Sequence, residues 1–447
     1  MSKDLLIKGG QIVNEGKIEV ADILIRNGRI ERIAPSINVD FEVKEINAEG
    51  KHVLPGVIDD QVHFREPGLT HKANIYTEAR AGVAGGTTTF MEMPNTVPNA
   101  LTQELLQDKY DIAANSALAN YSFYMGASND NYEEAMKTDL TKICGLKIFM
   151  GSSTGNMLVD NETVLSKLFS AFPGLIATHC EDEATVRNNF EKYKAIYDGK
   201  DVPYDIHAII RNEEGCFISS EMAVSLAKKY KTRLHILHIS SSEEINLFDN
   251  KMPLEQKRIT AEVCVHHLWF DAEDYREKGN LIKCNPAIKH DHRENLFQAL
   301  LDDHFDVIAT DHAPHQWEEK QKPYWEAPSG LPLIQHSLLA MLDFYKQGKI
   351  SLERIVEKMA HAPAICFEIK ERGYLREGYW ADIAIVDLNN STTVEKENVL
   401  FKCGWSPFEG HTFGSQVTDT IVSGHHVYSN GSFDGSVKGK RILFNRK

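Results

Sequence analysis

The sequence predicts an α/β protein: a (β/α)8 TIM-type barrel with a small β-sandwich domain formed by the N- and C-terminal segments. Three observations favour this fold class. Short apolar runs alternate with longer segments of helical period in the middle of the chain, eight such runs are found there, and both chain ends show only strand-like runs separated by turns. Alternating strands and helices favour a parallel sheet, and eight such units favour a closed barrel.

The predicted elements of the barrel follow one another along the chain. The strand-like runs are 56–64, 87–95, 120–127, 144–151, 174–181, 233–240, 258–270 and 306–315. The helix candidates between them are 71–84, 102–118, 183–198, 213–230 and 290–303. A doubly wound open sheet is the alternative, but that fold usually has a glycine-rich phosphate loop after its first strand. Here the first strand leads into HFREPG, so the barrel is preferred.

The two ends of the chain resemble each other in kind. Asn27-Gly28, Ser423-Gly424 and Asn430-Gly431 each separate strand-like runs, and such dipeptides favour tight hairpin turns. Chain termini often lie close together. We therefore expect residues 1–54 and 374–447 to form one composite β domain, and residues 55–373 to form the barrel.

Composition and charge exclude several classes of protein. The chain has 447 residues, of which 42% are hydrophobic and 25% charged, as in ordinary soluble globular proteins. Its net charge of −15 argues against nucleic acid as a partner, but not against a small anionic substrate. Seven cysteines without a C-x-x-C pair indicate a reducing compartment. With no membrane span and no secretory signal in MSKDLLIKGG, we expect a cytoplasmic protein with no membrane partner. A homo-oligomer stays open.

Ionisable side chains gather at the predicted strand ends. Gln61, His63 and Arg65 are spaced by two residues, so on a strand they point into one space. The other strand ends supply Asn95, Lys147, His179, His238, His266, His267, Asp311, His312 and His315. A lone histidine is more often a structural group, but in a barrel the carboxyl ends of all strands meet at one mouth. Imidazole and carboxylate are ligands of zinc and similar ions, which predicts a metal site.

Lys147 lies inside the apolar run GLKIFM. Burial of a charged ammonium is costly unless the charge is removed or paired. One interpretation is a lysine whose amine reaches water at the barrel rim. The other is a desolvated, nucleophilic amine that can react with CO2 to give a carbamate, an anionic ligand able to bridge two metals.

The motifs together resemble those of a known family. PGVIDDQVHFREPG, MEMPNT, GLKIFM, THCED, LHILHISS, KCNPAIK, IATDHAPH and SPFEGHTFG are similar to motifs of the amidohydrolase superfamily, and most similar to its dihydroorotase family, in the branch shared with hydantoinases and allantoinases. The motifs cover nearly the whole chain. The resemblance implies a metal-dependent hydrolase barrel with a β domain built from both termini.

The resemblance also implies a role for each site residue. It implies metal ligation by His63, His179, His238 and Asp311, with Gln61 at a further ligand position and Lys147 at the position of a carboxylated lysine. It implies that Arg65, Asn95 and His315 hold a substrate carboxylate, that Asn285 contacts substrate, and that Gly330 and Leu331 offer backbone groups. Asp311 is then also the catalytic acid and base. His266 and His267 receive no role. The implied cofactor is Zn2+.

The implied reaction is the interconversion of N-carbamoyl-L-aspartate and L-dihydroorotate, a step of pyrimidine (UMP) synthesis. Both compounds carry a carboxylate, which an arginine beside a ligand histidine can grip with two parallel hydrogen bonds. A hydantoinase or allantoinase would share the metal site without needing Arg65 and Asn95, and is the alternative.

Gln61 departs from the family pattern, which has His-x-His where this chain has Gln61-Val62-His63. A neutral amide oxygen is a poor zinc ligand. Gln61 would ligate weakly and leave an unequal pair of metals, or one site would be empty, or the chain would be a non-catalytic assembly partner of a carbamoyltransferase. The first two interpretations are favoured, because the other ligand positions and the carboxylate grip are present. We thus expect one tightly bound ion and a second site that is weak or empty.

Overall fold

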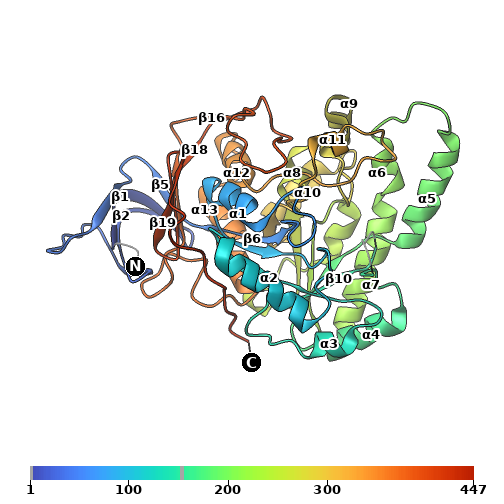
Figure 1. Cartoon of the computed structure of the whole chain (residues 1–447), viewed down its shortest axis with the longest axis horizontal. Helices are drawn as coiled ribbons and strands as arrows, with labels where there is room; N and C mark the ends of the chain where they lie inside the picture. The colour runs from blue at the N-terminus through green and yellow to red at the C-terminus, as the bar shows by residue number, and fades with distance from the viewer. Residues whose placement is uncertain (1–3, 152–155, 447) are drawn as a thin grey trace.

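The computed structural model describes residues 4–151 and 156–446. A β domain lies at one end of the molecule, with the barrel beside it, and Figure 1 shows the N-terminal strands in blue next to the C-terminal strands in red. The predicted fold class is confirmed. Within the described chain no helix is long and apolar enough to cross a membrane.

Eight parallel strand positions build the barrel, and each falls inside a predicted run. The strands are β6 (Val57–Val62), β7 (Thr87–Glu92), β8 (Asn120–Phe123) with β9 (Met125–Gly126), β10 (Leu146–Phe149), β11 (Leu175–His179), β12 (Arg233–Ile236), β13 (Ile259–Cys264) and β14 (Val307–Ala309). They form sheets of order β6-β7-β8 and β9-β10-β11-β12-β13-β14. The strands are buried along nearly their whole length, as expected for a parallel sheet covered by helices.

Two junctions close the barrel. At one, the third strand passes from β8 to β9 through Tyr124, whose backbone N–H donates to Glu92 O at 3.1 Å while Met125 N donates to Gly145 O at 3.1 Å. At the other, His63 N donates to His312 O at 2.7 Å, which joins the end of β6 to the segment after β14. The ends of the first and last strands therefore lie side by side at the mouth.

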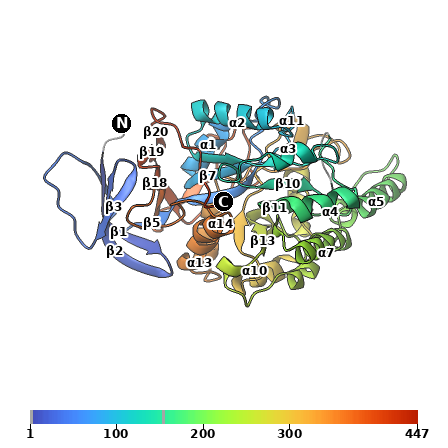
Figure 2. The same ribbon diagram turned by 90° about the horizontal axis from the view of Figure 1, so that it is seen from below.

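Helices follow the strands, and the predicted helices are present with the same or slightly shorter bounds. They are α1 (Ile75–Ala84), α2 (Gln103–Ser116), α3 (Tyr132–Met136), α4 (Glu162–Ala171), α5 (Glu183–Ile196), α6 (Ile206–Ile210), α7 (Glu213–Tyr230), α8 (Val265–Trp269), α9 (Tyr275–Lys278), α10 (Arg293–Leu301), α11 (Trp317–Lys320), α12 (Ser337–Lys346), α13 (Leu352–Val356) and α14 (Ala362–Cys366). Capping side chains set the starts of several helices. Asn74 accepts from Thr77 N before α1, and Asp182 accepts from Thr185 N before α5. Figure 2 shows the helices around the strands from below.

One element differs from the expectation. The run 258–270 was expected to be a single strand ending in His266-His267, but β13 ends at Cys264 and the two histidines lie in the short helix α8. The apolar period of a short run does not separate strand from buried helix. Both histidines are nevertheless buried near the carboxyl end of β13.

Strands from both chain ends share one nine-stranded sheet of the β domain. Its strands are β1 (Leu5–Asn14), β2 (Lys17–Arg26), β3 (Arg29–Ala34), β4 (Lys44–Asn47), β5 (His52–Pro55), β15 (Ile383–Asp387), β18 (Gln416–Val422), β19 (His425–Ser429) and β20 (Ser432–Phe433), with a separate pair β16 (Thr392–Thr393) and β17 (Thr412–Phe413). The order β20-β19-β18-β15-β5-β1-β2-β3 places C-terminal β15 directly against N-terminal β5.

A bulge in β1 lets this strand serve two neighbours. The register with β2 shifts between Ile7 and Gly10. Before the bulge β1 pairs with β4, and after it β1 pairs with β5. A side chain at Gly10 would approach Val53 Cγ2 to 2.4 Å, so the close packing of β1 on β5 requires glycine there.

The predicted hairpin turns have the expected backbone. Asn27 and Gly28 have φ of 51° and 81°, and the same pair of positive values recurs at Ser423-Gly424 and Asn430-Gly431. The domain boundaries 1–54, 55–373 and 374–447 remain a proposal. Near the C-terminus the chain also returns to the barrel, where Arg441 bridges to Tyr121 and Phe444 bridges to Ile369.

Candidate metal centre and substrate site

Gln61, His63 and Asp311 meet at the mouth of the barrel. His63 Nε2 lies 3.0 Å from Asp311 Oδ1, and the Gln61 amide donates from Nε2 to the same oxygen at 3.2 Å. Asp59, on the same strand as Gln61, supports this arrangement. Its Oδ2 accepts from Thr310 Oγ1 at 2.6 Å, which ties β6 to the residue that follows β14. The structure therefore brings together two residues of the first strand and one of the last, as expected for a barrel.

The hydrogen bonds of His63 favour a cation between His63 and Asp311. His63 Nδ1 donates to Asn95 Oδ1 at 2.8 Å, so the neutral ring has its lone pair on Nε2. Burial lowers the pKa of His63, although Asp311 raises it, which favours the neutral ring. A lone pair then faces a carboxylate oxygen at 3.0 Å. Two acceptors at this distance repel each other unless a proton or a metal ion lies between them.

A second pair of possible ligands, the imidazoles of His179 and His238, lies at the ends of β11 and β12. His179 Nε2 donates to Glu181 Oε2 at 2.9 Å, which leaves its Nδ1 facing His238 Nε2, also at 2.9 Å. Arg211 pairs with the same Glu181 carboxylate. Burial lowers the pKa of both histidines, that of His238 well below its usual value, so both rings are in the neutral form that binds metals. A carboxylate that orients a ligand histidine is a common support of metal sites.

Lys147 lies close to both pairs, because its charge and theirs act on one another. Its side chain is 1% exposed, and burial lowers the pKa of its amine to about 7, opposed by the carboxylates of Asp311 and Glu262. The pKa of His179 and that of His238 are in turn lowered in part by the Lys147 charge, so all these groups share one volume. The rim interpretation of Lys147 does not fit this burial, whereas a desolvated amine does.

These donors fit a divalent cation. They are imidazole nitrogens and carboxylate oxygens, the donor types that zinc and related ions bind. Within the described residues they fall into two pairs, His63 with Asp311 and His179 with His238, rather than into one compact group of three. The pairs can hold separate ions, with Lys147 close to both.

Three residues of this site have left-handed backbone. Arg65, His238 and Asp311 have φ of 68°, 41° and 48°. Such a conformation costs of order 1–3 kcal/mol for a residue with a side chain and persists where surrounding structure fixes it, commonly at active sites. Here it turns three side chains at strand ends toward the same mouth.

A positively charged region borders these donors. The Arg65 guanidinium donates from Nε to Pro314 O at 3.1 Å and lies 3.2 Å from His315 Nε2. On the other side of His315, Lys72 Nζ donates to Nδ1 at 2.9 Å. Burial and then the charge of Arg65 hold the pKa of His315 well below its usual range, and burial lowers the pKa of Arg65 to about 10. Glu319 lies 2.8 Å from Lys72 Nζ and offsets its charge, so Arg65 is the cation of this cluster that can hold an anion.

The remaining predicted contacts lie around the same mouth. His207 Nε2 donates to Asn285 Oδ1 at 3.1 Å. Gly330 has φ of 139° and its N–H donates to Lys283 O, while Leu331 O accepts from Ala313 N at 2.8 Å. A side chain at position 330 would meet Ala313 O at 2.4 Å, so this loop needs glycine. A pocket of about 260 Å³ next to these residues is lined by His207, Arg211, Lys283, Tyr324, Trp325 and Ser329.

Sequence reasoning missed several residues of this site. Lys72 follows HFREPGL in a loop, and the cluster of charges there was the available signal. Arg211 follows α6, far along the chain from the Glu181 that it pairs with, and no local pattern marks it. Asn95 was expected to hold a substrate carboxylate, and the structure shows in addition that its oxygen lies on His63. His312 is structural, because its ring binds Glu78 and the backbone of Leu333.

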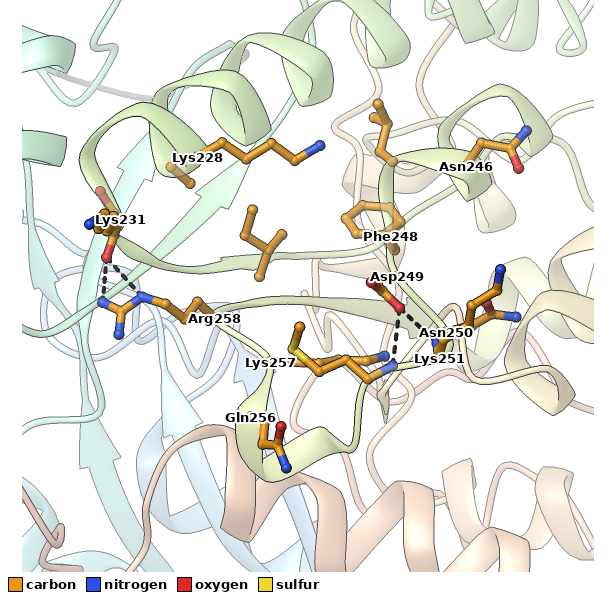
Figure 3. Close-up of a pocket in the computed structure, with 15 residues that line it drawn as sticks. Lys228, Lys231, Asn246, Phe248, Asp249, Asn250, Lys251, Gln256, Lys257 and Arg258 are labelled. Atoms are coloured by element: carbon orange, nitrogen blue, oxygen red, sulfur yellow. Dashed lines mark hydrogen bonds between the residues drawn. The ribbon is translucent and has the colours of Figure 1, made fainter.

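A larger pocket, of about 590 Å³, lies elsewhere on the barrel, at the start of β12 and β13. Figure 3 shows its lining, in which Arg258 donates to the backbone oxygen of Lys231. None of the predicted site residues lines it. Because active sites of such barrels lie at the carboxyl ends of the strands, this pocket is not the reaction site.

Comparison with known families agrees with this geometry. Residues 52–427 match the family described as "Amidohydrolase family". The chain belongs to the amidohydrolase family. The matched segment begins at β5 and runs through β19, so it includes every predicted ligand. This family is generally metal-dependent, in agreement with the donors at the barrel mouth.

Individual amidohydrolases are similar over nearly the full length. The dihydroorotase of Methanosarcina acetivorans is 32% identical over 424 residues, which cover 91% of this chain and 88% of that protein. The allantoinase of Bacillus velezensis is 30% identical, covering 96% of this chain and 95% of that protein. Among solved structures, the L-hydantoinase (dihydropyrimidinase) of Arthrobacter aurescens aligns with a TM-score of 0.92 and 26% identity, covering 99% of this chain and 100% of that one.

Proposed function

We propose that this amidohydrolase is a dihydroorotase, which interconverts N-carbamoyl-L-aspartate and L-dihydroorotate in pyrimidine synthesis. Full-length similarity to dihydroorotases supports the proposal. The observation that carries it is the position of Arg65 beside His315, next to His63 and Asp311. Both substrates carry a carboxylate that this cation can bind.

The residues of the chain divide the work of the reaction. Arg65 and His315 bind the carboxylate and fix the substrate against the metal ligands, which makes attack intramolecular in effect. A divalent ion held by the histidines would supply Lewis-acid activation of water and of the amide carbonyl. In the hydrolytic direction Asp311 Oδ accepts the proton of the attacking water and returns it to the leaving amide nitrogen. Asp311 lies at the end of β14, within reach of both His63 and Gln61.

We assign the cofactor as Zn2+, with its tighter site at His179 and His238. Lys147, with its pKa lowered to about 7, has a large fraction of neutral amine at neutral pH, the form that adds CO2 to give a carbamate ligand. Gln61 turns its amide nitrogen, a donor that cannot ligate, toward Asp311 Oδ1 at 3.2 Å. The site of His63 and Asp311 therefore lacks one strong ligand and holds its ion weakly.

The test combines an assay with metal analysis. The purified protein should turn over N-carbamoyl-L-aspartate and L-dihydroorotate, and should act on hydantoin and allantoin at least about a hundredfold less efficiently. Metal analysis of the same preparation should find zinc. Preference for hydantoin or allantoin would reject the dihydroorotase assignment while keeping the family.

Two other functions have specific support. Similarity to an allantoinase and to an L-hydantoinase fits a cyclic amide hydrolase of the same branch. Gln61 fits a non-catalytic assembly partner of a carbamoyltransferase, since the position lacks the family histidine. A non-catalytic assembly partner would turn over none of the four compounds, which are N-carbamoyl-L-aspartate, L-dihydroorotate, hydantoin and allantoin, even with the metal sites loaded.

A further inference from the structure

A third group of possible metal ligands lies at the end of β13, in addition to the pair of His63 with Asp311 and the pair of His179 with His238. Cys264 ends the strand, and His266 and His267 follow in α8. One ligand atom from each residue lies within 4.8 Å of the others, and all three residues are buried. Tetrahedral zinc with bond lengths of about 2.0–2.3 Å needs ligand atoms roughly 3.3–3.8 Å apart, a modest contraction from this arrangement.

The imidazoles of this group are unsatisfied. Within the described chain, both ring nitrogens of His266 and Nδ1 of His267 are buried without a hydrogen-bond partner. The backbone of Thr310 lies near His266 and partly opposes the effect of burial on the pKa of its ring. His267 Nε2 donates to Pro286 O at 3.1 Å, so its Nδ1 carries the lone pair. Leaving a buried polar atom unpaired costs about 1–3 kcal/mol. Three such atoms in two adjacent rings therefore point to a missing partner.

We propose that Cys264, His266 and His267 form an additional metal site with a thiolate ligand, which takes a borderline divalent ion such as Zn2+. One thiolate and two imidazoles are a common donor set for this ion. The Cys264 S–H donates to Glu262 Oε1 at 3.3 Å; metal binding replaces this S–H bond by a metal–sulfur bond, and the released proton goes to the buffer. The site lies beside the pair of His63 and Asp311, because Gln61 contacts both, and it differs from the two pairs described above in having a sulfur ligand.

Gln61 lies between the new site and the pair formed by His63 and Asp311. Its amide nitrogen donates to Asp311 Oδ1 at 3.2 Å, and its carbonyl oxygen lies 3.9 Å from Cys264 Sγ. The amide oxygen thus faces the new site, where it is placed as a weak fourth ligand. A histidine at position 61 would present no such oxygen to Cys264. The residue that departs from the family pattern is therefore the one that borders this site.

A neighbouring cluster of Asp60, His235 and Glu262 does not need an ion. His235 Nε2 lies 3.2 Å from Asp60 and 3.7 Å from Glu262. Burial lowers the pKa of His235, but the two carboxyl groups outweigh burial and raise it to about 9. The imidazolium is then itself the cation of that cluster. In contrast, burial lowers the pKa of His266 to about 4 and leaves its ring neutral.

Cobalt substitution tests the proposal on the full-length protein. Co2+ bound to a thiolate gives a sulfur-to-metal charge-transfer band in the near ultraviolet, which nitrogen and oxygen ligands do not give. Apoprotein titrated with Co2+ should develop this band, and Cys264→Ser should lose it and bind this equivalent at least about tenfold more weakly. Cys180→Ser and Cys284→Ser, at two other buried cysteines, are matched controls that should keep the band.

Each outcome decides the matter. Absence of the band in cobalt-loaded wild type overturns the site without any variant. Persistence of the band in Cys264→Ser, or its loss in Cys180→Ser, also overturns it. His267→Gln, which can keep the donation to Pro286 O, should weaken the cobalt equivalent even if Cys264→Ser does not fold. Failure of the dihydroorotase proposal would appear in turnover, not in this band.

Discussion

The oxygen of Asn95 lies 2.8 Å from Nδ1 of His63 and so directs the other ring nitrogen toward Asp311. Asn95 therefore orients His63, the proposed metal ligand, in addition to any contact with substrate. Outer groups of this kind commonly change metal affinity by about 10- to 100-fold.

Asn95→Ala should weaken metal binding at the site of His63 by about tenfold or more, because the ring loses the partner that fixes its tautomer. Competition with a chelator measures the affinity. Asn99→Ala, a nearby loop asparagine whose amide donates to Thr96 O, is the control. If only KM rises and metal affinity stays unchanged, Asn95 is a substrate contact alone.

Arg65→Ala should lower kcat/KM for N-carbamoyl-L-aspartate with metal content and fold unchanged. Loss of a buried charge-assisted contact costs on the order of 2–5 kcal/mol, which corresponds to roughly 30- to 4,000-fold. Steady-state kinetics measure the effect. Arg276→Ala, at an exposed arginine that pairs with Glu273, should leave the kinetics unchanged. Wild-type kcat/KM in Arg65→Ala would remove the main argument for a carboxylate substrate.

Asp311→Asn should abolish nearly all turnover while substrate still binds. The amide keeps the shape of the side chain but cannot accept the proton, and it is a weaker metal ligand. Calorimetric titration measures substrate binding, and a coupled assay measures turnover. The neighbouring carboxylate variant Asp306→Asn, which breaks a pair with Lys257 at the far end of β14, is the control for general damage to the barrel. Full activity in Asp311→Asn would place the proton transfer elsewhere.

Gln61→His should raise the occupancy of the site formed with His63 and Asp311, because imidazole is a stronger zinc ligand than an amide. Wild type should hold fewer tightly bound ions at this site than the variant does. Metal analysis after dialysis counts them. Gln61→Asn, which keeps an amide, should resemble wild type. Equal metal content in wild type and Gln61→His would show that the glutamine is no handicap.

His336 should make stability depend on pH. Burial lowers the pKa of its folded ring to about 3, while in the unfolded chain the ring titrates near its usual value of about 6.5. Below about pH 6.5 the ring binds a proton in the unfolded state but not in the folded state. The free energy of unfolding therefore falls as the pH falls from about 6.5 toward 3. The contribution at pH 5 is about 2 kcal/mol.

Urea unfolding of wild type and His336→Phe at pH 7 and pH 5 measures this contribution. Phenylalanine keeps a ring against Phe401 and Phe413 but does not titrate. The variant should lose less stability than wild type on going from pH 7 to pH 5. His290→Phe, at a ring whose side chain is 41% exposed, should keep the wild-type slope. Identical slopes for wild type and His336→Phe would contradict the prediction.

Contacts between residues that are far apart along the chain could not be predicted from the sequence. The end of β13 shows the limit of local patterns, since VCVHHLWF reads equally well as a strand or as a strand followed by a helical turn. The carboxylate of Glu181 shows another limit, because its partner Arg211 comes from a different element. Neither the propensity of a segment nor the spacing of its residues predicts which residues far apart along the chain lie close together in space.

The sequence by itself determined the eight strands, the hairpin turns of the β domain and the side chains available at the barrel mouth. Apolar period, turn dipeptides and the parallel direction of the strands are local properties, and they place His63, His179, His238 and Asp311 at one end of the barrel. The tertiary structure alone decided which of them face one another. It placed Asn95 on His63, turned the nitrogen of Gln61 to Asp311 and left three ring nitrogens of His266 and His267 without a partner among the described residues, because hydrogen bonds and burial depend on neighbours from other strands.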